Sequence, residues 1–241
     1  HDLMPTSPPN LLRLIAIAML AQMVFVSARM TGSLYALAHK ASAFTVGTLI
    51  ALFALIPMLV AVRAGRWIDR VGARGPIACG LGLTLLGAAV PAAFAYEYAD
   101  VAPLWVAAAL IGTGQMLVMI PIQQLIGERA PVAQRTLIFS WLSLGVSMSG
   151  LIGPVASGAL IDGAGHRAVY GAMMIVLLIA GGWLWLHRAL LPHRSQAPHH
   201  LEPAHPFELL RHTPLRDVLV ATVLVSMSWD LQTFMVPVHG T

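Results

Sequence analysis

Two charged residues, Arg29 and Asp230, lie inside long apolar segments of the chain. A charge deep in a lipid bilayer costs roughly 2.5–3.5 kcal/mol even on the most lenient scale, so such a residue indicates function. Each charge falls about 4–6 Å beyond the centre of its segment, on the same side of that centre. We therefore predict that Asp230 alternates between pairing with Arg29 and binding a proton, because a nearby cation favours the ionised acid and desolvation favours the neutral acid. A static ion pair that locks the helices is an equal alternative.

Other polar side chains lie where a solute could meet them. At about 100° per residue, Gln22, Arg29 and Ser33 fall within about 40° of one another on one helix face. Gln115 and Gln232 are further candidates for solute contact. A few amides, one base and one acid in apolar surroundings suit a modest-sized amphipathic or anionic organic solute, and they argue against sugars, which need many hydrogen bonds.

Several other chemistries are excluded. The single cysteine, Cys79, allows no internal disulfide, and we expect no metal site and no cofactor. No phosphate-binding Gly-x-x-x-x-Gly-Lys-(Ser/Thr) loop occurs, so the chain has no ATP-driven motor of its own. The apolar segments carry no nucleophile and base at helical spacing, so we expect no enzyme activity. Fourteen Lys and Arg against ten Asp and Glu are too few charges for a nucleic-acid interface.

The elements that must position these residues are membrane helices. The chain has 241 residues, 58% hydrophobic and 10% charged, with a mean hydropathy of +0.77, far from the composition of a soluble domain. A helix needs about 20 apolar residues to cross the bilayer core, where only helices or closed barrels satisfy the backbone. We predict an all-α membrane protein with seven spans, at residues 11–36, 44–62, 76–95, 103–126, 137–161, 168–190 and 215–238.

The basic residues predict the orientation of these spans. With the amino terminus inside, eleven of the fourteen Lys and Arg lie in inner segments, whereas only Lys40 and Arg167 lie outside and Arg29 lies within a span. Loops rich in Lys and Arg remain cytoplasmic. We therefore expect a multi-pass protein of the inner (cytoplasmic) membrane with a cytoplasmic amino terminus and the lipid bilayer as its solvent.

The segment between the second and third predicted spans carries the most informative motif. Here Gly65, Asp69, Arg70, Gly72 and Arg74 match the pattern Gly-x-x-x-Asp-(Arg/Lys)-x-Gly-(Arg/Lys)-(Arg/Lys). The segment resembles the signature loop of the major facilitator superfamily, which gates conformational change in that family. We interpret it as a cytoplasmic loop in which Gly65 permits close approach of helix ends and Gly72 a tight turn. The chain departs from the pattern at residue 73, which is alanine in place of a base.

A second motif lies on the fifth predicted span. Gly153, Pro154 and Gly158 match a Gly-Pro motif that is similar to that of the superfamily's antiporter branches, although serine replaces glycine at 149 and 157. The resemblance implies export, and Pro154 is expected to kink the helix. The alternative is that these small residues serve only close helix packing and indicate nothing about export.

A third family feature is missing. Proton-coupled members commonly carry an arginine one turn before a glycine on the fourth helix, but in this chain Ala108 precedes Gly112.

The chain divides into three predicted regions. Residues 1–191 form a six-helix bundle, residues 192–214 form a cytoplasmic linker with five prolines and five histidines, and residues 215–241 hold a seventh helix. The resemblance implies the amino-terminal half of a twelve-helix transporter plus the first helix of its second half, with the rest of that half as a missing partner. We expect a secondary transporter of a small organic solute that works by alternating access, with proton coupling and efflux favoured. The alternatives are an uptake porter of an organic anion and a non-transporting receptor or assembly subunit.

Overall fold

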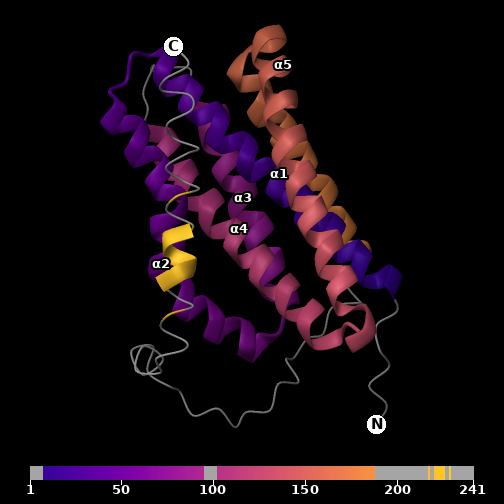
Figure 1. Ribbon diagram of the computed structural model, residues 1–241. Helices are drawn as coiled ribbons and strands as arrows, with labels where there is room; N and C mark the ends of the chain where they lie inside the picture. The colour runs from indigo at the N-terminus through magenta and orange to yellow at the C-terminus, as the bar shows by residue number, and fades with distance from the viewer. Residues whose placement is uncertain (1–7, 95–101, 188–216, 218–219, 226–227, 229–241) are drawn as a thin grey trace. The chain divides into compact units, whose positions relative to one another are not determined.

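The computed structural model describes residues 8–94, 102–187, 217, 220–225 and 228. The chain separates into two compact units, His1–Ser195 and Gln196–Thr241. The five described helices of the first unit are long and apolar enough to cross a membrane. They are α1 (Pro8–Ala38), α2 (Ala43–Val71), α3 (Arg74–Phe94), α4 (Ala102–Arg129) and α5 (Val132–Leu186), as Figure 1 shows.

The described part of the second unit is small. Residues 217, 220–225 and 228 are helical and fall within the predicted seventh span, 215–238. The predicted linker, 192–214, lies outside the described residues, as do Asp230 and Gln232. The count of six spans plus one and the three predicted regions therefore remain predictions.

Helix α5 is too long to be a single straight span. Its 55 residues would extend about 82 Å, against a hydrocarbon core of about 30 Å. Gly165, at φ 79° and ψ 170°, interrupts the helical backbone, and it lies between the predicted fifth and sixth spans, 137–161 and 168–190. Such dihedrals are accessible essentially only to glycine, which explains why the chain turns at this residue.

Contacts with α1 show that α5 doubles back at Gly165. Before the glycine, Ser149 contacts Met19, so this part of α5 starts beside the early turns of α1. After it, the ring of His166 packs edge-on against Tyr35 near the end of α1, with centroids 5.5 Å apart. Met173, further along α5, lines a small cavity together with Met23 of α1, so the second half of α5 runs back along α1, opposite in direction to the first half (Figure 1).

The interface between α3 and α4 depends on glycines. A Cβ atom at Gly80 would lie 2.6 Å from the carbonyl oxygen of Gly114, and one at Gly87 would lie 2.7 Å from Ile111. These distances leave no room for a larger residue. Small residues that let helix backbones approach closely are typical of membrane helix interfaces.

The structure corrects the predicted boundary of the second span. Helix α2 does not end near residue 62 but continues to Val71, so Gly65, Asp69 and Arg70 are helical rather than part of a loop. The 29 residues of α2 extend about 43 Å, which exceeds the bilayer core of about 30 Å. The last turns of α2 carry exposed arginines, which are favourable where the helix has left the bilayer core and entered the interfacial region. The low hydropathy of these turns therefore marks the end of the apolar segment and not the end of the helix.

Candidate functional site

The centre of the candidate site is a hydrogen bond between two amides. Gln115 Nε2 on α4 donates to Gln22 Oε1 on α1 over 2.6 Å. Each residue lies midway along its helix. Gln115 is only 7% exposed, and its Oε1 atom accepts no hydrogen bond from the described residues. The interior of the bundle thus offers a buried amide oxygen with unused capacity at the middle of two spans.

Arg29 continues the same face of α1. Its guanidinium lies over the ring of Phe25, 5.8 Å from the centroid, and Phe25 meets Phe53 of α2 edge-on at 5.6 Å. Ser33 lies one turn further, where its hydroxyl donates to the Arg29 carbonyl oxygen over 2.8 Å. The predicted polar face therefore points toward α2 and α4 through Phe25 and Gln22. Asp230, the predicted partner of Arg29, lies outside the described residues.

The signature segment forms a tight turn between α2 and α3. Gly72 has φ 78° and ψ −177°, which favours glycine strongly, and its backbone N–H donates to the Ile68 carbonyl oxygen over 2.8 Å. The structure confirms the turn predicted at Gly72. At Gly65, by contrast, an added Cβ would meet no heavy atom within 4 Å, so no close contact with a described residue requires glycine there.

One amide connects this turn to the end of α4. Gln124 Nε2 donates to Glu128 Oε1 at 2.9 Å and approaches Asp69 Oδ1 at 3.4 Å. Sequence reasoning missed Gln124. The signal available was its position four residues before Glu128, which places the two side chains together on the helix surface.

The Gly-Pro motif packs against α1. A Cβ at Gly153 would lie 3.0 Å from Ser27 Oγ and 3.1 Å from the Met23 carbonyl oxygen, so the predicted close packing is present at this residue. The hydroxyl of Ser149, where the family has glycine, donates to the carbonyl oxygens of Met19 and Gly145.

The helix continues through Pro154, and Gly165 is the residue of α5 with non-helical dihedrals, so the predicted kink at Pro154 stays a prediction. Gly158 is less tightly packed, since its nearest contact would be Met30 Cε at 4.0 Å.

The fourth-helix position without arginine also has a structural explanation. Ala108 is fully buried, and Gly112 lies so close to α2 that an added Cβ would overlap the backbone of Phe53. Gly112 thus serves helix packing. Among the described residues, no group of three or more His, Cys, Asp or Glu could hold a metal ion.

Comparison with known proteins agrees with this architecture. The sequence profile described as Major Facilitator Superfamily matches residues 14–241. No curated protein matches the chain.

Among solved structures, the chain is similar to a POT family transporter in complex with 5-aminolevulinic acid, with 17% identity and a TM-score of 0.68 over 94% of this chain and 47% of that one. It is also similar to the POT family transporter PepTSo, with 16% identity and a TM-score of 0.69 over 86% of this chain and 42% of that one. At this identity the similarity establishes the fold. The chain spans under half the length of these solved transporters.

Proposed function

The chain belongs to the major facilitator superfamily, a family of multi-pass membrane transporters rather than enzymes, and from this premise we propose that it forms part of a secondary transporter of a small organic solute. The observation that carries the proposal is the Gln22–Gln115 contact. Secondary transporters bind their solutes near the bilayer midplane, and this contact lies at the middle of α1 and α4.

The free acceptor on Gln115 favours a solute that carries hydrogen-bond donors. A buried carbonyl oxygen without a partner costs free energy, and an amide or ammonium group of a solute would remove that cost. A peptide transporter and a 5-aminolevulinic acid complex are among the similar solved structures, and both solutes carry amino groups. We therefore favour an amphipathic organic solute with an amide or amino group and an anionic group that Arg29 would attract.

For coupling, we propose that Arg29 and Asp230 exchange an ion pair for a protonated acid during the cycle. Arg29 lies seven residues after Gln22, about 10 Å further along α1. A proton on Asp230 would release Arg29 to the solute, and loss of that proton would restore the pair. The direction we propose is export, which rests on Gly153, Pro154 and Gly158. Uptake of an organic anion, and a receptor or assembly role without transport, are the alternatives.

We further propose that the protein lies in the inner membrane with a cytoplasmic amino terminus. Four basic residues lie around the junction of α2 and α3, namely Arg63, Arg66, Arg70 and Arg74. Lys40 lies near the other end of α2, between α1 and α2. Cytoplasmic segments carry such an excess of basic residues.

The experiment that tests the proposal is proton flux in proteoliposomes that contain the intact protein. A pH-sensitive dye is trapped inside, and 5-aminolevulinic acid, a dipeptide and an amphipathic organic anion are added in turn as probes. We expect at least one probe to change the internal pH with the wild-type protein and not with Asp230→Asn, while the control Gln123→Leu, an exposed amide on α4, behaves as wild type. Unchanged coupling in Asp230→Asn contradicts the role of Asp230. The absence of any probe movement, with or without a pH gradient, favours the non-transporting alternative.

A further inference from the structure

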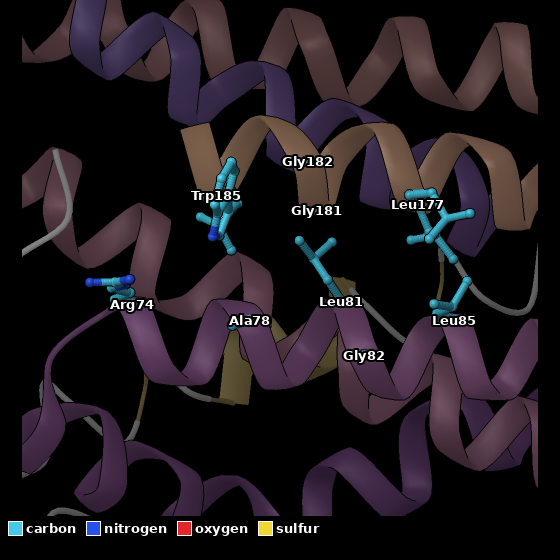
Figure 2. A pocket seen from close by; sticks show the side chains of 11 residues that line it. Arg74, Ala78, Leu81, Gly82, Leu85, Leu177, Gly181, Gly182 and Trp185 are labelled. Atoms are coloured by element: carbon cyan, nitrogen blue, oxygen red, sulfur yellow. The ribbon is translucent and has the colours of Figure 1, made fainter. Parts of the chain in front are cut away.

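A groove of about 370 Å³ lies between α3 and the end of α5. Figure 2 shows Arg74 and Trp185 at one end of the groove and Leu85 and Leu177 at the other. Apart from Arg74, the groove is lined by aliphatic side chains, Trp185 and glycines. Among the described residues that line the groove, Arg74 and the indole N–H of Trp185 supply the side-chain donors, too few for a solute that needs several hydrogen bonds.

Three glycines, Gly82, Gly181 and Gly182, keep this groove open. A Cβ atom at any of them would meet no heavy atom within 4 Å. They differ in this respect from Gly80 and Gly114, where the two helix backbones touch. Helix packing therefore does not require glycine at these three positions, and their effect is to leave space between α3 and α5.

Arg74 is the one charged residue among those that line the groove. Arg74 begins α3, whose first turn carries no acidic residue. The preceding turns of α2 carry three more arginines and one acid, Asp69, and the arginines, Arg63, Arg66 and Arg70, line a separate depression of about 280 Å³. Basic pockets between membrane helices at the cytoplasmic surface are known to bind anionic lipid headgroups. Trp185, 64% exposed, is of the residue type that lies at the headgroup level.

The length of the groove matches one leaflet of a bilayer. From Arg74 to Leu85, α3 rises about 16 Å, and half of the hydrocarbon core is about 15 Å. A chain that enters beside Arg74 would therefore reach the bilayer midplane near Leu85. Because Trp185 and Leu178 are exposed, the groove opens onto the surface of the helix bundle.

We propose that this groove binds an anionic phospholipid, with one acyl chain lying over Gly82, Gly181 and Gly182 and the phosphate lying against Arg74 and Trp185. The aliphatic lining selects an acyl chain, and the arginine selects the negative headgroup. A phospholipid held here would join α3 to the end of α5 on the side of the bundle that their direct packing leaves open.

The test uses the purified intact protein and two lipids with the same acyl chains, dioleoyl phosphatidylglycerol and dioleoyl phosphatidylcholine. We expect phosphatidylglycerol to raise the Tm by several degrees more than phosphatidylcholine does. Arg74→Gln should weaken phosphatidylglycerol binding about fivefold and remove this difference. Gly181→Leu should remove the response to both lipids, because the new side chain fills the groove. Lys40→Gln and Gly171→Leu, the latter in the same half of α5 but away from the groove, serve as controls that keep the wild-type response.

A second measurement separates lipid binding from a folding defect. In a variant whose only tryptophan is Trp185, phosphatidylglycerol with brominated acyl chains should quench the fluorescence more strongly than brominated phosphatidylcholine. Equal quenching by the two lipids, or equal Tm shifts in wild type and Arg74→Gln, overturns the proposal. Lipid-independent association of two copies that Gly181→Leu abolishes also overturns it, since the groove would then bind a helix of a second copy.

Discussion

Gln22 and Gln115 join the middles of α1 and α4 through a hydrogen bond of 2.6 Å, although 93 residues separate them in the chain. This bond places the polar face of α1 against α4 and leaves one amide oxygen without a partner among the described residues. It links α1 to α4 within the bundle, and it is the contact on which the proposed solute site rests.

Removal of one amide should destabilise the bundle by a measurable amount. Gln115→Leu leaves Gln22 Oε1 without its donor, and we expect the free energy of unfolding to fall by about 0.6–1.7 kcal/mol, the range for membrane helix hydrogen bonds. The measurement is unfolding of the detergent-solubilised protein in a denaturant series. The double variant Gln22→Leu with Gln115→Leu should lose less than the sum of the single losses. Additive losses, or an equal loss in the exposed control Gln123→Leu, contradict a direct bond.

Two glycines on α4 should respond oppositely to the same change. Gly112→Ala places a methyl group into the backbone of Phe53, and we expect a loss of about 1–3 kcal/mol through overpacking. Gly127→Ala meets no atom within 4 Å, and alanine in a helix is favoured over glycine by about 0.5–1 kcal/mol. Thermal unfolding of both variants checks the difference in sign. A stable Gly112→Ala protein would mean that α2 and α4 do not approach so closely.

The two turn glycines should not tolerate alanine. Gly72 and Gly165 have positive φ with ψ near 180°, a region that costs a non-glycine residue about 1–3 kcal/mol. Gly72→Ala and Gly165→Ala are therefore expected to lower the stability by about this amount, as measured by Tm. The helical controls Gly75→Ala and Gly163→Ala, which have room for a Cβ, should retain the wild-type Tm or exceed it. Equal behaviour of test and control variants would refute the turn geometry.

The serine that replaces glycine in the Gly-Pro motif should contribute to the contact between α1 and α5. Ser149→Ala loses the hydrogen bond to the Met19 carbonyl oxygen, and we expect a loss of about 0.5–1.5 kcal/mol. Ser147→Ala, at an exposed position two residues earlier, is the matched control. The measurement is again denaturant unfolding. If the two variants unfold at the same denaturant concentration, the hydroxyl of Ser149 does not stabilise the contact between α1 and α5.

The sequence predicted most of the fold because hydropathy reports directly on what lipid requires. The predicted first span, 11–36, lies within α1, and the fourth, 103–126, lies within α4. Hydropathy failed at α2, where the arginines of the last turns lower the mean value while the helix continues past the bilayer core. Helix length in the interface depends on capping and packing, such as the burial of Ile68 and the turn at Gly72, which hydropathy does not measure.

The candidate site could be predicted only in part. Helical spacing placed Gln22, Arg29 and Ser33 on one face. In the structure Gln22 bonds to α4, and Arg29 lies over Phe25, which meets α2. Spacing within one helix cannot identify a partner on another helix, so the bond from Gln22 to Gln115 was not foreseen. The groove at Gly181 was missed for the same reason, because it exists only where α3 and α5 lie together.

The packing of both halves of α5 against α1 has a consequence for biosynthesis. The hydrogen bond between Ser149 and the Met19 carbonyl oxygen cannot form until 130 further residues have been synthesised after Met19. At about 5–20 residues per second, a ribosome needs about 7–26 s to synthesise the intervening segment. During that interval α1 must reside in the bilayer without either half of α5, with Arg29 as its one charged residue beyond the first turns. The long apolar stretch of α1 favours its insertion into the bilayer before these neighbours are made.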